Sequence, residues 1–344
     1  MTVLRRTADT PLPLMPAAAV THSTRSVRRG EIIQVTRGVY APRDAWQALP
    51  PWQQYLARVR AHLLNAPDDV LCLESAVALH GLPVIGAAHD IHVLGSASAT
   101  ARSVRGVRVH TSAHPDRVIE EVDGIRLTSI ADTCIDVART RHPAIALAVA
   151  DAAARVDERC AALALATLNE ERASARGRRR ARWALHRVDP AAESPLESLS
   201  RAVAEWAGFA EPELQVWFGP PDGNGDRVDF WWPGRRIAGE ADGLLKYDGR
   251  FGDPRLAIKK REDRDRRLRA RRAGRAALGL GRSRRPEFPG SPAQRRGAPG
   301  CRRSRHRPLA QPRHGSASPA LAVAMPEPRP GAGCARPRAT ARTP

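Results

Sequence analysis

Apolar and polar residues alternate along this chain at two different spacings, and these spacings predict a mixture of helices and strands. In Pro195–Ala207 the apolar residues recur close to i, i+3, i+4 and i+7, which predicts a helix, and Trp52–Leu64 shows a similar amphipathic pattern. Three further stretches predict helices, namely Leu71–His80, Ala131–Ala138 and Ala144–Leu168. Short β-rich runs predict strands at Glu31–Val35, Ile91–Leu94, Val107–Thr111, Gly124–Ser129 and Glu213–Phe218. We therefore expect a modular α/β (α+β) protein of two or three domains, which 344 residues can accommodate.

A β-hairpin is predicted in the second half of the chain. The β-rich runs Val228–Trp232 and Arg236–Asp242 flank the pair Pro233-Gly234. Proline presets φ at one turn position and glycine accepts a positive φ at the next, so the pair favours a tight turn between two strands. The two runs should therefore pair with each other.

Three carboxylates fall on this hairpin. Side chains alternate between faces along a strand, so Glu240 and Asp242 share one face. A loop of two or four residues would place Asp229 on that face, whereas a loop of three residues would separate it. Converging carboxylates repel one another unless a cation lies between them, and hard oxygen ligands suit Mg²⁺. The alternative is that these carboxylates are solvated on an open sheet face, opposite Arg235 and Arg236.

The elements around the hairpin follow the order α-β-β-β-α, which ends in a highly charged helix predicted at Leu256–Leu268. Residues 193 to about 268 resemble the Vsr-like, endonuclease-related domains of the PD-(D/E)xK nuclease superfamily. The motifs that carry the resemblance are E-S-P-L-E-S-L-S-R at Glu193–Arg201, R-V-D-F at Arg227–Phe230, E-A-D-G at Glu240–Gly243 with Lys246-Tyr247, and K-K-R-E-D at Lys259–Asp263.

The resemblance implies a metal-dependent DNA endonuclease. It assigns Asp229 and Glu240 as ligands of Mg²⁺ or Mn²⁺, Glu197 and Asp242 as supporting ligands, and Lys246 as a cation for the transition state. A metal held in this way lowers the pKa of its bound water, which then attacks a phosphodiester. The superfamily usually places a lysine two residues after the strand glutamate, and Asp242 stands at that position here.

The first 50 residues show a smaller pattern. A short polar segment, Thr24–Arg29, precedes the β-rich run Glu31–Val35 and then R-G-V-Y-A-P at Arg37–Pro42. A short helix followed by two strands that close on a glycine turn is typical of a winged helix, which presents arginines to the DNA backbone. The alternative is a small hairpin that caps the next domain. The R-G-V-Y motif resembles the wing of AbiEi-type antitoxins, which implies DNA binding. The candidate contacts are Arg28, Arg29 and Arg37.

Residues 51–170 resemble the domain that follows the wing in the antitoxin family. The shared patterns are S-A-x-x-L-H-G and T-S-x-x-D-T-x-x-D, and the family implies a cognate toxin as a protein partner. Ser75 and Ser129 can cap helices, while Asp132 and Asp136 lie one turn apart. Capping and solvated-face roles explain these side chains as well as a metal or nucleotide site does. The histidines that such a site could add are His80, His92 and His110.

An arginine cluster, R-G-R-R-R-A-R-W, lies in the segment that joins the two halves. Residues 171–192 are predicted to form an arginine-rich helical linker. One interpretation is a solvated linker helix, and the other is an electrostatic contact to phosphates through Arg178, Arg179 and Arg180.

The formal net charge of +20 arises mostly from the last segment. Residues 271–344 contain 17 arginines, no lysine and only two acidic residues, which gives +15. This composition has no apolar periodicity, so we expect a disordered basic tail. Residues Ala277–Gly290 can be encoded by codons that read R-W-G-W-A-D-L-D-D-P-N-S-L in another frame, and that string has strand-then-helix character. We hypothesise a frameshift between about Arg264 and Arg272 that removes the last strand of the nuclease-like domain.

Cysteine spacing and hydropathy indicate the state of the thiols and the location of the protein. The five cysteines show no CxxC spacing and predict buried free thiols, and no apolar run reaches membrane-spanning length, so we expect a cytoplasmic protein. The expected domains span 1–50, 51–170, 171–192, 193–270 and 271–344. Three hypotheses follow, namely a metal-dependent DNA endonuclease, a non-catalytic DNA-binding regulator or antitoxin, and a pseudogene product without function.

Overall fold

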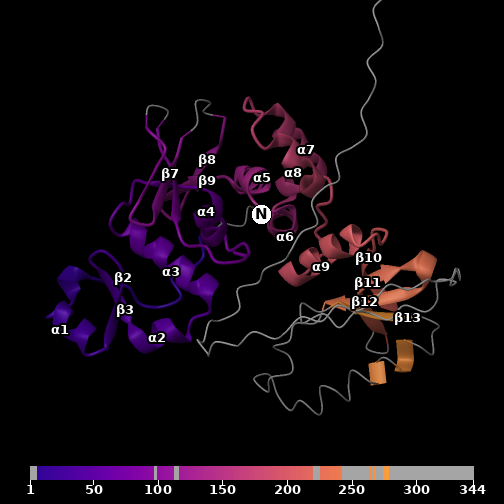
Figure 1. Cartoon of the computed structure of the whole chain (residues 1–344), viewed down its shortest axis with the longest axis horizontal. Coiled ribbons are helices and arrows are strands. Elements are labelled where there is room, and N and C mark those ends of the chain that lie inside the picture. The colour runs from indigo at the N-terminus through magenta and orange to yellow at the C-terminus, as the bar shows by residue number, and fades with distance from the viewer. Residues whose placement is uncertain are drawn as a thin grey trace, which may run out of the picture. The chain divides into compact units, whose positions relative to one another are not determined.

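The computed structural model describes residues 6–96, 99–111, 116–219, 225–241, 263–264, 266–268 and 274–278, the last of these as backbone alone. Within these residues the chain is a mixed α/β protein that contains three separate sheets (Figure 1). The predicted fold class is therefore confirmed. The structure describes no helix with the length and apolar character needed to cross a membrane.

The N-terminal segment forms a small antiparallel sheet with strand order β1-β3-β2. Strands β2 and β3 are joined at Arg37 and Gly38, and Gly38 has a φ of +71°, which a glycine adopts at low cost. The predicted short helix followed by two strands is confirmed. The elements are β1 (Met15–Pro16), η1 (Ala17–Ala19), α1 (Ser23–Arg28), β2 (Ile32–Thr36), β3 (Val39–Pro42) and α2 (Arg43–Ala48).

The middle of the chain forms a six-stranded sheet with order β6-β7-β5-β4-β9-β8. Strand β5 has the bounds that the sequence predicted, whereas the short strands β4, β6 and β8 were not predicted. A core that includes Tyr55, Leu71 and Leu127 fills the space between this sheet and the helices α3 and α4. These elements are α3 (Pro51–Leu63), β4 (Val70–Leu71), α4 (Leu73–Leu79), β5 (Ile91–Leu94), β6 (Arg102–Val104), β7 (Val107–His110), β8 (Ile119–Val122) and β9 (Ile125–Thr128).

Helices follow the six-stranded sheet and share one apolar core. The alanine-rich stretch that was predicted as one helix is divided, because Asp157 leaves the helical conformation and its carboxylate caps the next turn at the backbone N–H of Arg159. The helices are α5 (Ile130–Thr140), α6 (Pro143–Val156), η2 (Glu158–Cys160), α7 (Ala162–Glu171) and α8 (Arg178–Leu185).

The prediction of a solvated linker helix is wrong for α8. Its Ala181, Ala184 and Leu185 are buried in the same core as α5 and α6. Only one face of the helix carries the arginine cluster, and the small apolar residues between the arginines pack inward. The segment 171–192 is therefore part of the central helical layer.

A four-stranded mixed sheet with order β10-β11-β12-β13 follows α9. Strands β10, β11 and β12 are antiparallel, and β13 runs parallel to β12. The hairpin closes where Trp232 pairs with Ile237, so its loop holds four residues. The elements are α9 (Pro195–Trp206), β10 (Glu213–Phe218), β11 (Asp226–Trp232), η3 (Pro233–Arg235), β12 (Ile237–Ala241) and β13 (Gly274–Leu278).

Two predictions about this sheet have different outcomes. Strand β13 contradicts the expectation that the sheet loses its last strand near residue 270, because the backbone of Gly274–Leu278 pairs with β12. Of the charged helix predicted at Leu256–Leu268, residues 263–264 and 266–268 are described and are helical. The rest of that helix and residues 279–344, which include most of the predicted tail, lie outside the described residues.

Helix α9 buries a different face from the one that its apolar spacing suggests. Val203 is 48% exposed and Trp206 is 43% exposed, whereas Ser198 and Arg201 are almost fully buried. The reason is that α9 has neighbours on two sides. Its Ala204 packs with aromatic residues of the sheet, while its polar residues bind a buried aspartate of α6.

The cysteines agree with the prediction where they are described. Cys72, Cys134 and Cys160 are buried free thiols. Burial raises the pKa of Cys72 strongly, so this thiol is protonated at neutral pH. Cys301 and Cys334 lie outside the described residues.

Candidate functional site

The strongest candidate site in the C-terminal sheet is the carboxylate pair of Asp229 and Glu240. Strand β11 pairs with β12 in a register that joins Phe230 to Gly239, and the next residues in that register are Asp229 and Glu240. Directly opposed residues of antiparallel strands place their side chains on the same face. The arrangement predicted for a four-residue loop is therefore present.

Hydrogen bonding holds Asp229 beside the end of β12. Its Oδ2 accepts the backbone N–H of Ala241 at 2.8 Å, and Ala241 directly follows Glu240. The carboxylate thereby takes a strand N–H at the point where the β11–β12 ladder stops. The side chain of Asp229 is fixed in position, which suits a residue that must present an oxygen in a defined direction.

Close packing buries the strand that carries Glu240. A Cβ atom added at Gly239 would lie 2.8 Å from the ring of Trp232 and 3.3 Å from Phe230, so only glycine lets β12 approach these aromatic residues. Glu240, on the other face of the strand, is itself only 7% exposed. A buried carboxylate requires a positive charge nearby.

Arg264 supplies a positive charge at Glu240 in this structure. Its Nη2 lies 2.5 Å from Glu240 Oε1, and it also donates to the backbone carbonyl of Arg227. Arg267 forms a two-pronged ion pair with the buried Asp226, with distances of 2.9 and 2.6 Å. Sequence reasoning missed both pairs, and the dense run of arginines before residue 270 was the only signal for them.

Glu197, which was predicted as a supporting metal ligand, has a different position. It lies in the first turn of α9, where its carboxylate accepts the Ser194 hydroxyl at 2.7 Å and the Glu193 backbone N–H at 2.8 Å. Gln215 donates to the same carboxylate at 2.8 Å. Ser194 and Glu197 form a capping box, which satisfies N–H groups at the start of the helix.

Two of the four predicted metal ligands are brought together. The described residues contain no group of three or more side chains that could hold a metal ion. Asp242 and Lys246 lie outside the part of the chain that the structure describes. The opposed Asp229 and Glu240 still match the one or two carboxylates that Mg²⁺ usually takes from a protein, its other ligands being water and phosphate oxygens.

The predicted DNA contacts of the N-terminal segment are accessible. Arg28, Arg29 and Arg37 are exposed, and Arg37 lies at the tip between β2 and β3. Arg29 has a weak ion pair with Glu31 at 3.7 Å. Exposed arginines at a strand tip can approach a phosphate backbone without a change in the fold.

The arginine cluster of α8 divides into two kinds of position. Arg178 is partly buried and donates to the backbone carbonyl of Arg172, so it helps to hold the turn before the helix. Arg179 and Arg180 are exposed. Two of the three predicted contacts are thus free to meet a ligand.

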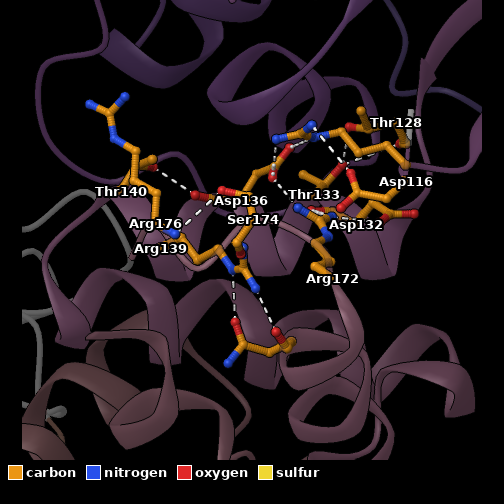
Figure 2. Close-up of polar contacts among 12 residues, drawn as sticks. Asp116, Thr128, Asp132, Thr133, Asp136, Arg139, Thr140, Arg172, Ser174 and Arg176 are labelled. Carbon is orange, nitrogen blue, oxygen red and sulfur yellow. Dashed lines mark hydrogen bonds and ion pairs between the residues drawn. The ribbon is translucent and has the colours of Figure 1, made fainter. Parts of the chain in front are cut away.

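The aspartates of α5 are not solvated, which corrects one of the two roles considered for them. Asp132 and Asp136 are buried, and Arg172 lies between them with a nitrogen 2.5 Å from an oxygen of each (Figure 2).

The two serines that were predicted to cap helices have different roles. Ser129 caps α5 as expected, because its hydroxyl accepts the backbone N–H of Asp132. Ser75 does not cap a helix. It lies inside α4 and bonds to the backbone N–H of His92.

The histidines of the middle domain form one close pair. Nδ1 of His92 lies 2.9 Å from Nε2 of His110, and Nε2 of His92 lies 3.3 Å from Glu74. Burial lowers the pKa of His92 to about 4, so its ring is neutral near pH 7. His80 lies apart from this pair, with its Nε2 2.9 Å from the carbonyl oxygen of Thr128.

Comparison with known proteins identifies relatives in mycobacteria. The chain is 33% identical over 227 residues, which cover 65% of this chain and 78% of the relative, to "Uncharacterized protein MT2308" of Mycobacterium tuberculosis (strain CDC 1551 / Oshkosh). The same values apply to "Uncharacterized protein Rv2248" of Mycobacterium tuberculosis (strain ATCC 25618 / H37Rv). The chain belongs to the family of these two mycobacterial proteins.

Membership of this mycobacterial family establishes kinship over most of the relatives' length. Neither relative's name states an activity. No protein-family model matches the chain, and no solved structure matches it. The function of this branch of the family must therefore be argued from the sites themselves.

Proposed function

We propose that the protein is a metal-dependent, endonuclease-like protein that hydrolyses DNA phosphodiesters. The observation that carries the proposal is the opposition of Asp229 and Glu240 on adjacent antiparallel strands of a mixed four-stranded sheet. The same two residues are the metal ligands that the Vsr-like resemblance implies. The proposed location is the cytoplasm, where both DNA and Mg²⁺ are available.

Each residue has a separate role in this proposal. Asp229 and Glu240 hold Mg²⁺ or Mn²⁺, which lowers the pKa of a bound water and neutralises charge on the phosphate. Arg264 holds Glu240 in this structure, so a metal at Glu240 would have to displace its guanidinium, which would then be available to a phosphate. The Vsr-like resemblance adds Asp242 as a supporting ligand and Lys246 as a cation for the transition state, and both lie outside the described residues. Glu197 fixes the start of α9 and acts on the site only through Gln215.

A second candidate function is a non-catalytic DNA-binding regulator, such as the antitoxin of a toxin–antitoxin system. The ion pair between Arg264 and Glu240 favours it, because a guanidinium already neutralises the carboxylate that catalysis would need for a metal. Asp242 at the position usual for lysine favours it as well. In that case the exposed Arg28 and Arg37 contact DNA phosphates, and the middle domain contacts a toxin protein.

Cleavage of plasmid and oligonucleotide DNA in Mg²⁺ or Mn²⁺ tests the first function. Asp229→Asn and Glu240→Gln should each abolish cleavage, since each removes a negatively charged ligand and keeps the shape of the side chain. Glu213→Gln is the matched control, because Glu213 is an exposed carboxylate on the same sheet and should keep full activity. Cleavage that survives both site substitutions would exclude this site as the catalytic centre.

Binding measurements separate the two functions. Arg264→Gln removes the guanidinium that competes for Glu240, so a genuine metal site should bind Mn²⁺ several-fold more tightly in this variant, as measured by the electron paramagnetic resonance of free Mn²⁺. Retention of DNA with no cleavage and no change in Mn²⁺ affinity would instead support the regulator. Arg28→Ala and Arg37→Ala should then weaken DNA binding and reduce its salt dependence.

A further inference from the structure

A cavity of about 820 Å³ in the middle domain has an unusual arginine content. Its wall comes from the start of α4, from β5 and β7, from the residues before β8, from α5, and from the turn between α7 and α8 with the first turn of α8. Seven of its 17 lining residues are arginines, against two aspartates. Sites for small molecules commonly enclose between about 300 and 1,000 Å³, so the volume suits a ligand of nucleotide size.

Four of the seven arginines are neutralised by carboxylates of the protein. Their nitrogen–oxygen distances lie between 2.5 and 2.9 Å, which are typical of charge-assisted hydrogen bonds. Both aspartates of the wall face Arg117, at 2.8 Å for Asp136 and 3.8 Å for Asp116. The pairs are Arg108–Asp90, Arg117–Asp136, Arg172–Asp136 and Arg141–Glu74.

The other three arginines bind no carboxylate within the described residues. Arg139 is only 9% exposed, yet its guanidinium donates solely to neutral oxygens, those of Asn169 at 2.8 and 2.5 Å and of Ser174 at 2.7 Å (Figure 2). Burial and the neighbouring Arg172 lower the pKa of Arg139. Arg176 and Arg180 are exposed at the cavity and have no acidic partner among the residues described. Positive charge therefore exceeds negative charge on this side of the wall.

Arg172 gives a second, independent sign of a missing partner. Its side chain is almost fully buried and lines the cavity, and its Nε has no hydrogen-bond partner among the residues that the structure describes. A buried donor without a partner costs about 1–3 kcal/mol, so native structures rarely leave one unless another group reaches it. An acceptor in the cavity would satisfy this nitrogen.

The start of α8 adds to the positive potential. The first three residues of this helix are arginines, and no acidic residue lies in its first turn. A helix N-terminus carries a partial positive charge and favours anions. Three arginines at this end are therefore electrostatically unfavourable unless an anion is bound there. Gly177 precedes the helix with a φ of +76°, and a Cβ atom on it would lie 2.8 Å from Cβ of Arg139. The helix end is thus held against α5 at the wall of the cavity.

We propose that this cavity binds the terminal phosphate groups of a nucleotide or of a nucleic acid strand. Arg176 and Arg180 at the exposed side attract and bind the phosphates, and the partial positive charge at the start of α8 favours them there. Arg172 supplies the buried donor. The site shares no residue with Asp229 and Glu240, so it does not depend on the proposed cleavage activity.

Calorimetric titration of the full chain with pyrophosphate tests the proposal. Arg176→Ala and Arg180→Ala should each weaken binding about tenfold, as expected for loss of one charge-assisted contact. Arg126→Ala is the matched control, since Arg126 is an exposed arginine of β9 that does not line the cavity, and it should change affinity less than twofold. Denaturation by urea should show that all three variants keep the stability of the parent protein.

Two further titrations distinguish the sources of the phosphate. A nucleoside triphosphate that binds with the same arginine dependence identifies a free nucleotide. A 5′-phosphorylated oligonucleotide that binds more tightly than its unphosphorylated form, again with that dependence, identifies a strand end. The proposal is overturned if none of these ligands binds at millimolar concentration, or if Arg126→Ala weakens binding as much as the cavity substitutions do.

Discussion

Asp151 of α6 and Arg201 of α9 form a buried ion pair, with Arg201 Nη2 lying 3.0 Å from Asp151 Oδ2. Asp151 also accepts the Ser198 hydroxyl at 2.7 Å and the Asp189 backbone N–H at 2.9 Å. These bonds join the helix that precedes the C-terminal sheet to the central helices. The domain boundary expected at residue 193 is therefore crossed by a buried polar contact, and the two sides are packed as one.

Replacement of Arg201 by methionine should be strongly destabilising. The substitution leaves a buried carboxylate without its cation, which typically costs about 3–5 kcal/mol of unfolding free energy. Burial raises the pKa of Asp151 to about 6 even with Arg201 present. Arg201 lowers that pKa, so Asp151 takes up a proton at a higher pH in the variant than in the parent protein. The loss should therefore be greatest in alkaline solution and should shrink as the pH falls toward 6, because Asp151 then becomes neutral in the variant.

Urea denaturation at pH 7.5 and pH 5 measures this effect. The exposed Arg179→Met serves as the matched control and should change stability by less than about 0.5 kcal/mol. The double variant Asp151→Leu with Arg201→Met should recover much of the loss, since no charge remains buried. A double variant as unstable as Arg201→Met alone would argue against the ion pair as the cause.

Glu197 offers a test that separates a structural role from a metal-binding role. Glu197→Ala removes the capping box and should lower the unfolding free energy by about 1 kcal/mol. Glu197→Gln keeps an acceptor oxygen for the Glu193 N–H and should cost less than half as much. Both variants should keep the Mn²⁺ affinity of the parent protein, and a clear loss of affinity in Glu197→Gln would show that Glu197 is a metal ligand after all.

Two glycines with the same backbone conformation should respond differently to alanine. Gly124 has a φ of +73° with nothing within 4 Å of an added Cβ, so Gly124→Ala should cost only the conformational strain of about 1 kcal/mol. Gly177→Ala adds a clash with the backbone and Cβ of Arg139 and should cost roughly 1–3 kcal/mol more. Thermal and urea unfolding of the two variants gives the comparison, and equal losses would disprove the close contact between α8 and α5.

His92 should make the protein less stable in mild acid. Its folded-state pKa is about 4, mainly because of burial, whereas the unfolded chain has a histidine pKa near 6.5. As the pH falls from about 6.5 to 4, the unfolded state gains a proton that the folded state does not, so stability is lost, by on the order of 3 kcal/mol at most. His110 has a lowered pKa and contributes in the same direction.

The pH dependence of urea unfolding checks this expectation. His92→Asn should flatten the curve between pH 4 and 6.5. The exposed His89→Asn is the control, and it should leave the shape of the curve unchanged. Asp151, whose pKa is raised to about 6, contributes a gain in stability as the pH falls through the same range, so the parent protein alone does not give the test. A curve for His92→Asn with the same shape as that of the parent protein would contradict a neutral, buried His92.

Local chemistry made the hairpin predictable. The β-rich runs and the Pro233-Gly234 turn fix two strands, and a four-residue loop then determines that Asp229 and Glu240 share a face. Strand β10 was predicted with its observed bounds for a similar reason, because a loop rich in glycine and proline follows it. Such features depend on neighbouring residues alone.

Partners that are distant in sequence explain what could not be predicted. Arg172 lies 36 residues from Asp136 and 40 from Asp132 in the sequence. No short-range sequence pattern therefore reveals that it forms buried ion pairs with both aspartates. In the same way, the pairing of Arg264 with Glu240 and the burial of Arg201 depend on how separate elements pack. The arginine-lined cavity was missed because its wall is assembled from several segments, each of which shows only ordinary surface charges.

Strand β13 changes how the sheet is completed as the chain is made. Because β13 runs parallel to β12, residues 242–273 must all be synthesised before Gly274 can reach its place beside Ile237. Until residue 278 has left the ribosome, β12 has one neighbour and its outer backbone groups are open to any other strand. Strand β12, which carries Glu240 of the carboxylate pair, thus gains its second neighbouring strand only late in synthesis. A chaperone would protect the open edge of β12 most in the interval before that.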